Sequence, residues 1–203
     1  MREDEFVVEE PEKQKDEKKQ KKRSPLSYLL EGMIYIALIV FCVYVVPNYI
    51  IQRTVVSGES MQDTLQNGES LLVSKISYKM ADPERYDIIV FYPKGRDVDE
   101  YYVKRIYGLP GETIQIKEQD IYINGSKIED PYAKDAMLEA GLAEEPFTLA
   151  EDEFFVLGDH RSLSLDSRTA PEDEPSGPGP VKRENIAGKV VLRIWPLNKF
   201  GVP

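Results

Sequence analysis

The segment Ile121-Tyr-Ile-Asn-Gly-Ser-Lys-Ile128 predicts a β-hairpin, and with it the class of the fold. Asn124 and Gly125 occupy the turn, and a type I′ turn requires a positive φ at both central residues, which Asn and Gly tolerate best. The runs on either side, Ile121-Tyr-Ile123 and Ser126-Lys-Ile128, have the length and composition of short strands. We therefore expect antiparallel β structure in this part of the chain.

Similar apolar runs, rich in Val, Ile, Tyr and Phe and bounded by turn residues, recur on both sides of the hairpin. None shows a sustained helical period, and we expect one short helix, around Lys134–Ala140. The predicted strands are Arg53–Val56, Ser70–Lys75, Asp87–Tyr92, Glu100–Ile106, Thr113–Ile116, Ile121–Ile123, Phe154–Leu157 and Val190–Ile194. The pattern predicts a mainly β domain over residues 52–203, with antiparallel sheet in a sandwich or barrel-like form.

Two segments of this domain do not fit the strand pattern. Residues 129–152 form an acidic insert, and residues 169–180 are rich in Pro and Gly. Because Pro lacks a backbone N–H, the stretch Pro171-Glu-Asp-Glu-Pro-Ser-Gly-Pro-Gly-Pro180 cannot continue a sheet. We expect it to be an exposed loop.

An apolar run precedes the β domain. No charged residue lies between Gly32 and Gln52, and Met33–Val46 is almost wholly apolar. A helix needs about 20 apolar residues to cross about 30 Å of hydrocarbon, so residues 26–51 are expected to be a transmembrane anchor. A buried core helix would have a polar face, which this run lacks. A cleaved signal peptide would be shorter and would end at a small-x-small site.

The N-terminal tail carries its charges in two blocks. Residues 1–12 contain one basic and six acidic residues, and residues 13–23 contain seven basic and two acidic residues. With few apolar residues to bury, residues 1–25 are expected to be a disordered charged tail. The basic run Lys18–Arg23 is suited to contact anionic lipid headgroups. It also predicts a single-pass protein of the cell membrane, with a cytoplasmic N-terminus and an extracytoplasmic β domain.

The composition of the 203-residue chain argues against several functions. It contains 26 Lys and Arg against 36 Asp and Glu, and a net charge of −10 disfavours nucleic-acid binding, which depends on neutralising phosphates. The single Cys, Cys42, excludes an intramolecular disulfide and a Cys-rich zinc site, and the single His excludes a His-rich metal site. No metal or other cofactor is expected. Any catalysis would depend mostly on Ser, Lys, Asp, Glu or Tyr.

The polar turn Ser57-Gly-Glu-Ser-Met-Gln-Asp-Thr-Leu65 follows a predicted strand directly. With Cys and His scarce, a Ser or Thr activated by Lys is the remaining nucleophile of the triad type. Gly58 lets the backbone approach a substrate carbonyl, and the amide of Ser60 or a neighbour could donate to an oxyanion. A surface turn that happens to contain Ser would look the same.

A second segment, Tyr101–Glu112, offers a lysine. Strand alternation places Lys104 on one face with Tyr102 and Ile106. Burial among apolar neighbours would lower the pKa of this Lys toward neutrality and let it accept a Ser proton, which Arg cannot do. A structural Lys on a half-buried strand would give the same pattern, and Lys75 is a rival candidate.

The third segment, Phe154–Arg168, is an apolar strand that runs into a dense polar loop. Its acidic and basic side chains could form a salt-bridge network that holds the loop, in a structural or a functional role. The residues of this network would be Asp159, Arg161, Asp166 and Arg168. His160 is expected to be an ordinary loop residue rather than a base.

Together these segments resemble the type I signal peptidases, membrane-anchored Ser/Lys endopeptidases that remove signal peptides from exported proteins. The similarity extends over nearly all of residues 26–203, and one anchor with a short catalytic domain resembles the Gram-positive form. The blocks that carry it after the anchor are Ser57-Gly-Glu-Ser-Met61, Arg85-Tyr-Asp-Ile-Ile-Val-Phe91, Tyr102-Val-Lys-Arg-Ile-Tyr-Gly-Leu-Pro-Gly111, Gly158-Asp-His-Arg-Ser-Leu-Ser-Leu-Asp-Ser-Arg168 and Gly188-Lys189 to Trp195-Pro196.

The resemblance implies a role for each matching residue. Ser60 would be the nucleophile and Lys104 the general base, and Ser164 would hydrogen-bond the Lys104 amine and orient it. The supporting residues would be Asp159, Asp166 and Arg168. Met61 would help to shape the pocket for the small residue before the cleaved bond. The Ser60 amide would serve as an oxyanion donor, whereas Gly58 stands where some members place a Ser hydroxyl.

The resemblance also implies the reaction and the partners. The chain would cleave N-terminal signal peptides from secretory preproteins after a small-x-small motif, at the lipid bilayer and with the secretion translocon as a further partner. Two positions depart from the family, which usually has Pro at Asp63 and Asn at His160. Neither departure removes a catalytic group, so we expect effects on efficiency and substrate range.

Three other functions would fit parts of the pattern. A self-cleaving repressor has a similar Ser/Lys β domain, but it is soluble and carries a DNA-binding helical domain that residues 1–23 cannot form. A signal-peptidase-like factor for the assembly of surface structures would show little or no turnover. A structural module would present the insert at residues 129–152 to partners.

Overall fold

The computed structural model describes residues 24–98 and 100–203. The disordered tail expected over residues 1–25 therefore falls almost wholly outside the described residues. Residues up to Val40 belong to one compact unit, and Phe41–Pro203 forms another. The two units are described separately.

The apolar run is helical, as expected. Helix α1 comprises Pro25–Val40, and η1, Phe41–Ile50, has the wider hydrogen-bond spacing of a π-helix. Pro25–Ile50 is long and apolar enough to cross a membrane. The helix continues three residues beyond Pro47, and near its end the Asn48 side chain donates a hydrogen bond to the Tyr44 carbonyl at 2.7 Å.

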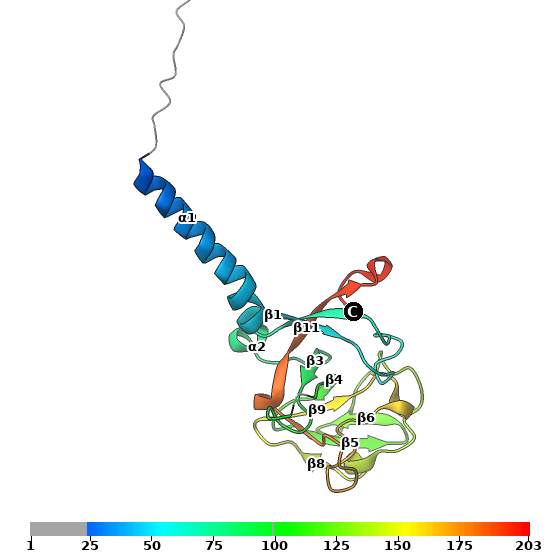
Figure 1. The fold of residues 1–203 in the computed structure, drawn as a ribbon. Coiled ribbons are helices and arrows are strands. Elements are labelled where there is room, and N and C mark those ends of the chain that lie inside the picture. The colour runs from blue at the N-terminus through cyan, green and yellow to red at the C-terminus, as the bar shows by residue number, and fades with distance from the viewer. Residues whose placement is uncertain (1–23, 99) are drawn as a thin grey trace, which may run out of the picture. The chain divides into compact units, whose positions relative to one another are not determined.

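Phe41–Pro203 contains two antiparallel sheets (Figure 1). The larger sheet has seven strands in the order β1-β2-β11-β3-β4-β9-β10, and the smaller has four in the order β7-β6-β5-β8. The strands are β1 (Ile51–Val55), β2 (Ser70–Ser74), β3 (Ile88–Phe91), β4 (Tyr102–Gly108), β5 (Thr113–Lys117), β6 (Asp120–Ile123), β7 (Ser126–Lys127), β8 (Phe147–Thr148), β9 (Glu153–Leu157), β10 (Val181–Lys182) and β11 (Ile186–Trp195). The prediction of a mainly β fold with antiparallel sheets is confirmed.

The predicted hairpin is present between β6 and β7. Asn124 has φ 51° and Gly125 has φ 78°, so both central residues have the positive φ that the type I′ turn requires. Each of the eight predicted strands is also found, with ends that differ by a few residues. The largest difference is β11, which begins four residues before the predicted Val190.

The predicted helix over Lys134–Ala140 is wrong. These residues are irregular, and the 3-10 turn η2 (Gly141–Ala143) begins only after them. The short helix α2 (Ser77–Met80), between β2 and β3, was not predicted. The Lys134 N–H donates to the Asp159 carbonyl at 2.8 Å instead of to its own segment. Hydrogen bonds to a distant loop thus replace the local bonds that a helix would need.

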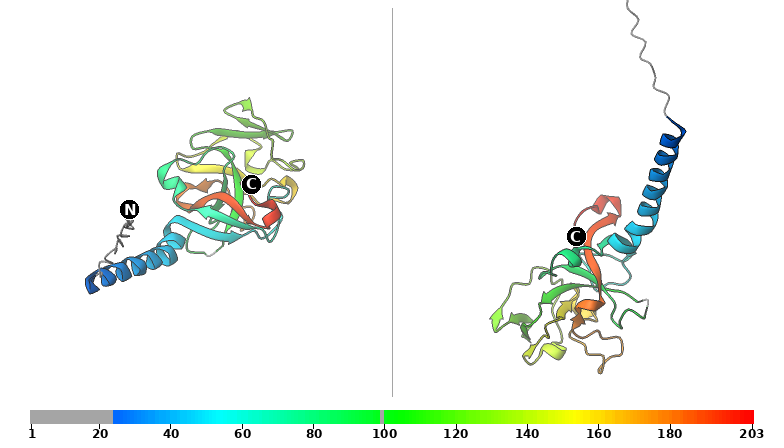
Figure 2. Two further views of the ribbon diagram at one scale, coloured as in Figure 1. Left: turned by 90° about the horizontal axis from the view of Figure 1, so that it is seen from above. Right: turned by 90° about the vertical axis from the view of Figure 1, so that its left-hand side faces the viewer.

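Strand β11 holds the larger sheet together. It pairs with β2 along one edge and with β3 along the other, so the long C-terminal strand lies beside the β1–β2 pair (Figure 2). Its register shifts between Val190 and Leu192 and again between Arg193 and Trp195. β-Bulges of this kind bend a strand and increase its twist.

Candidate active site

Ser60 lies in the loop between β1 and β2, and its neighbours hold that loop in the core. Met61 and Leu65 are 2% and 0% exposed and pack in one hydrophobic cluster with residues of β2 and β3. The Leu65 N–H donates to the Met61 carbonyl at 2.7 Å, which closes one helical turn. Gly58 has φ +102°, a conformation that favours glycine, and its N–H donates to the Asn67 side chain at 3.2 Å. Ser60 is therefore presented on a fixed turn.

Lys104 reaches this turn from β4. Its side chain is buried, and its Nζ lies 2.6 Å from Ser60 Oγ, close enough for a hydrogen bond. Burial lowers the pKa of Lys104 from 10.5 to about 8; the Arg168 charge lowers it too, while Asp166 and Asp159 raise it. A substantial fraction of this amine is thus neutral near pH 8, and a neutral amine can accept a proton from the serine.

The pair opens into a cavity of about 420 Å³. Its lining includes residues 54–56, residues 100–104 and the buried Met61. The aliphatic part of the lining comes from Val55, Val56, Met61, Val103, Leu163 and Leu165. The cavity therefore offers an apolar surface next to a serine and a partly neutral lysine.

Asp159 pairs with Arg105, the neighbour of Lys104 on β4. The Arg105 guanidinium donates to both carboxylate oxygens, at 3.0 and 2.8 Å, and the side chains are 3% and 0% exposed. The Thr64 hydroxyl adds a third hydrogen bond to the same carboxylate at 2.6 Å. Because Thr64 follows Ser60 in the turn, this pair connects β4, the turn and the loop after β9.

Asp166 and Arg168 form a second buried pair. Arg168 Nε lies 2.8 Å from Asp166 Oδ1, and Asp166 Oδ2 accepts from the Gly158 N–H at 3.1 Å. Arg161 pairs instead with Asp130 of the insert, at 2.5 Å. The single network expected from Asp159, Arg161, Asp166 and Arg168 is therefore divided into separate pairs, because the insert and β4 supply two of the partners.

The loop after β9 packs directly on the Ser60 backbone. The His160 N–H donates to the Ser60 carbonyl at 3.0 Å. A Cβ on Gly158 would lie 2.4 Å from that carbonyl oxygen and 2.2 Å from Ser164 Oγ, so only glycine fits there. The expected hydrogen bond between Ser164 and Lys104 is not formed: among the described residues, the buried Ser164 Oγ has no hydrogen-bond partner.

The remaining candidates lie elsewhere. The Lys75 amine donates to the Pro47 and Asn48 carbonyls at 3.4 and 3.3 Å and lines another cavity, so it does not face Ser60. Within residues 24–98 and 100–203, no group of three or more His, Cys, Asp or Glu side chains is placed to hold a metal ion.

Comparison with known proteins agrees with this arrangement. The model of the family described as signal peptidase, peptidase S26, matches residues 29–195. This chain belongs to the signal peptidase family. Similar relatives are a signal peptidase I of Leptolyngbya laminosa, 35% identical (86% of this chain, 84% of the relative), one of Bacillus caldolyticus, 39% identical (75% and 84%), and the signal peptidase I P of Bacillus subtilis subsp. natto, 33% identical (91% and 97%).

The two departures from the signal peptidase pattern both contact the acidic insert. Asp63 Oδ1 lies 3.3 Å from the Lys134 amine, and His160 Nε2 lies 3.7 Å from Asp135 Oδ2. Asp135 also accepts from the Ser162 N–H at 3.3 Å. Lys134 and Asp135, two adjacent residues of the insert, therefore contact the turn of Ser60 and the loop that packs on it.

Arg105 is the site residue that sequence reasoning missed. The sequence did carry a signal, because alternation along a strand that places Lys104 on one face places Arg105 on the other. A charged side chain in a strand with apolar residues on both faces needs a buried partner. What the sequence did not indicate was which carboxylate that partner would be.

Proposed function

We propose that this chain is a membrane-anchored serine endopeptidase that cleaves N-terminal signal peptides from exported preproteins after a small-x-small motif. Membership of the signal peptidase family supports the reaction class. The observation that carries the proposed mechanism is the 2.6 Å approach of the buried Lys104 amine to Ser60 Oγ. A nucleophile and a base within hydrogen-bond reach are the minimum that acyl transfer requires.

In the first half of the reaction, neutral Lys104 takes the proton of Ser60, and the serine oxygen bonds to the carbonyl carbon of the scissile peptide. The Ser60 N–H would donate to the oxyanion of the tetrahedral intermediate. The C–N bond then breaks, Lys104 gives its proton to the leaving amine, and the mature protein departs. The signal peptide remains as an ester on Ser60.

In the second half, Lys104 takes a proton from water, and the hydroxide attacks the ester carbonyl. The C–O bond to Ser60 breaks, the serine recovers its proton from Lys104, and the signal peptide leaves with a new carboxylate. Asp159, Asp166 and Arg168 take no part in bond breaking. They support the site through the two buried pairs that hold the loops around it.

The cavity suits an extended peptide. Strand β1 is the edge strand of the larger sheet, so one side of its backbone is available to pair with another strand. Residues 54–56 of this edge line the cavity together with Ser60 and Met61. The Met61 side chain limits the space beside the nucleophile, which favours a small residue before the cleaved bond.

The proposed anchor brings enzyme and substrate to the same surface. Pro25–Ile50 would cross the cell membrane, with a cytoplasmic N-terminus indicated by the basic run Lys18–Arg23 and the β domain on the extracytoplasmic face. A signal peptide is apolar and enters the same bilayer from the translocon. Confinement to one surface raises the effective concentration of the two partners.

The test is cleavage of a secretory precursor by the full chain in lipid vesicles. Ser60→Ala and Lys104→Met should each lower the rate by at least about 1,000-fold, because both residues act as one catalytic unit. Ser126→Ala and Lys117→Met, at exposed positions of the smaller sheet, are matched controls that should cleave normally. Full activity of either dyad variant would refute the assignment, and a folded wild-type chain without turnover would favour a non-catalytic assembly factor.

A further inference from the structure

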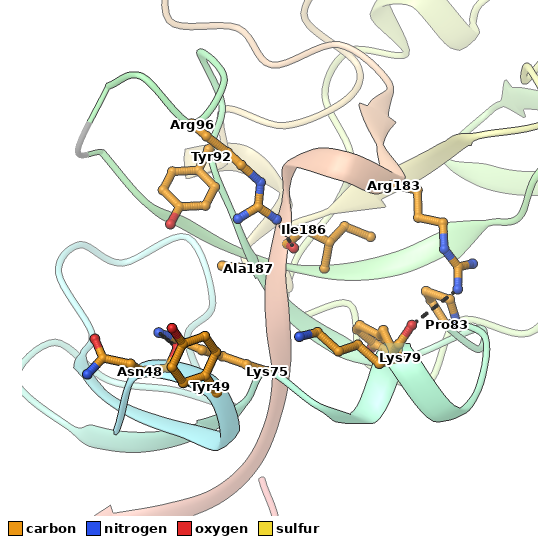
Figure 3. Close-up of a pocket in the computed structure, with 11 residues that line it drawn as sticks. Asn48, Tyr49, Lys75, Lys79, Pro83, Tyr92, Arg96, Arg183, Ile186 and Ala187 are labelled. Carbon is orange, nitrogen blue, oxygen red and sulfur yellow. Dashed lines mark hydrogen bonds between the residues drawn. The ribbon is translucent and has the colours of Figure 1, made fainter. Parts of the chain in front are cut away.

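A second cavity, of about 320 Å³, lies at the end of the apolar helix and shares no lining residue with the cavity of Ser60. Its eleven lining residues include four basic side chains and no acidic one. The basic residues are Lys75, Lys79, Arg96 and Arg183. Figure 3 shows them around the space beside Ile186 and Ala187, with Lys75 and Lys79 from one segment and Arg96 and Arg183 from two others.

Three of these four basic side chains form no ion pair within residues 24–98 and 100–203. Lys75 donates only to carbonyls of η1, and Arg96 donates to the Glu184 and Ile186 carbonyls at 2.5 and 2.9 Å. Across the described part of the chain, no carboxylate forms an ion pair with Lys75, Lys79 or Arg96. The side chains that line the cavity therefore carry an excess of positive charge, which an anion would neutralise.

The fourth basic residue is only weakly compensated. Arg183 lies 2.8 Å from Asp82, whose side chain is 87% exposed, and an ion pair in that setting contributes little. Its guanidinium also donates to the Tyr78 carbonyl at 3.3 Å, which holds it at the cavity rim (Figure 3).

One of the cations, Arg96, is held in place before any ligand arrives. Two backbone carbonyls fix the Arg96 guanidinium, which also lies 5.0 Å from the centre of the Tyr92 ring. Guanidinium and ammonium groups fixed around a small cavity are typical of sites for phosphate oxygens, which accept hydrogen bonds from both. Because the Arg96 guanidinium is ordered in advance, an anion that bound to it would cause little further loss of its side-chain entropy.

The position of the cavity indicates which kind of phosphate compound would reach it. Asn48 and Tyr49, which line it, belong to the last turn of the Pro25–Ile50 helix. If this helix crosses the bilayer as proposed above, its last turn lies at the depth of the lipid headgroups, where tyrosine is also enriched. We propose that this cavity binds the phosphate group of an anionic phospholipid. The proposal uses the anchor of the proposed function but not its catalysis.

The test is retention of lipid by the purified full chain, measured by native mass spectrometry from micelles that contain equal phosphatidylglycerol and phosphatidylcholine. The wild type should retain phosphatidylglycerol at least about tenfold over phosphatidylcholine, and Lys79→Glu should reduce this preference several-fold. Lys79 is exposed and forms no side-chain hydrogen bond or ion pair among the described residues, so the fold should tolerate the change. Lys117→Glu, in the smaller sheet, is the matched control. Equal retention of both lipids, or an unchanged Lys79→Glu variant, would overturn the proposal.

Two further arms separate the alternatives. Inorganic phosphate at millimolar concentration should not displace the retained phosphatidylglycerol; displacement would show a site for soluble phosphate and would refute the lipid assignment. Ser60→Ala should retain phosphatidylglycerol like the wild type, since it changes only the dyad. If the wild type retains phosphatidylglycerol but does not cleave the precursor, the proposed function fails and this inference stands. If it cleaves the precursor without preferring phosphatidylglycerol, only this inference fails.

Discussion

Arg105 and Asp159 form a buried ion pair with two hydrogen bonds. Arg105 is the residue next to Lys104 in β4, and its side chain lies on the opposite face of that strand. Such a pair is costly to break, because the partner left behind is a charge in an apolar setting. The pair therefore fixes the strand that carries the proposed base.

Asp159→Asn should consequently destabilise the domain by about 3–5 kcal/mol, the usual cost of removing one partner of a buried pair. Thermal unfolding of the full chain in detergent measures the change. The double variant Arg105→Leu/Asp159→Leu should lose less than Asp159→Asn alone, since no uncompensated charge remains. Lys127→Ala, which breaks an exposed pair with Asp120, should cost less than about 1 kcal/mol. Equal effects of Asp159→Asn and Lys127→Ala would contradict the structure.

Cleavage should depend on the protonation of Lys104. Burial lowers its pKa to about 8, and only the neutral amine can accept the Ser60 proton. The value of kcat/KM should therefore rise about tenfold per pH unit below pH 8 and reach a plateau above it. A profile governed by a pKa near 10.5, the ordinary value for Lys, would show that Lys104 is solvated and is not held as the structure has it.

The same residue should make stability depend on pH. Between pH 8 and pH 10.5, the unfolded chain binds a proton at Lys104 that the folded chain does not, so the free energy of unfolding should rise with pH in this window. Below pH 8, both states are protonated, and this contribution is constant. Lys104→Met should remove the rise, and the difference between the two unfolding curves measures it.

Gly158→Ala should lower the cleavage rate about 100-fold with a fold that is only moderately destabilised. The added Cβ would lie 2.4 Å from the Ser60 carbonyl oxygen and 2.5 Å from Ser164 Cβ, so the Ser60 turn or the loop must move. Overpacking of this kind costs about 1–3 kcal/mol, and a shift of about 1 Å at a nucleophile costs about 100-fold in rate. Gly32→Ala is the control, since a Cβ there meets nothing within 4 Å. Normal turnover by Gly158→Ala would contradict the packing described.

The insert should affect the rate through Asp135. This carboxylate accepts from the Ser162 N–H and lies near His160, whose own N–H holds the Ser60 carbonyl. Asp135→Ala should lower kcat/KM about 3- to 30-fold, because it loosens the loop that carries Leu163 and Leu165 of the Ser60 cavity. Glu145→Ala, an exposed acidic residue of the same insert, should be silent. If both variants behave alike, the insert contributes only charge.

The strands were predictable because each is a local run of β-forming residues, and the 121–128 hairpin was predictable because its turn needs Asn and Gly. The conformation of Lys134–Ala140, where a helix was expected, depends on contacts with residues far along the chain. The Lys134 N–H bonds to the Asp159 carbonyl, and local propensity could not indicate that. Tertiary hydrogen bonds overrode the local preference.

The candidate site shows the same division. The alternation of β4 and the resemblance of three separate segments to one family brought Ser60 and Lys104 together, and the structure places them 2.6 Å apart. The choice of Arg105 rather than Arg161 as partner of Asp159 depends on sheet order and register, since β4 pairs with β9 and sets Arg105 opposite Leu157. Sequence alone carries no signal for that register.

Because β11 lies between β2 and β3, the larger sheet can be completed only late in synthesis. The ribosome makes this strand after every other strand of the larger sheet. Until residues 186–195 have emerged, the sheet consists of two halves, one with β1 and β2 around Ser60 and one with β3 and β4 around Lys104. In a chain still in synthesis, the proposed nucleophile Ser60 and the proposed base Lys104 would thus lie on two parts of the sheet that β11 has not yet joined. The peptidase activity would begin only when translation of the domain is complete.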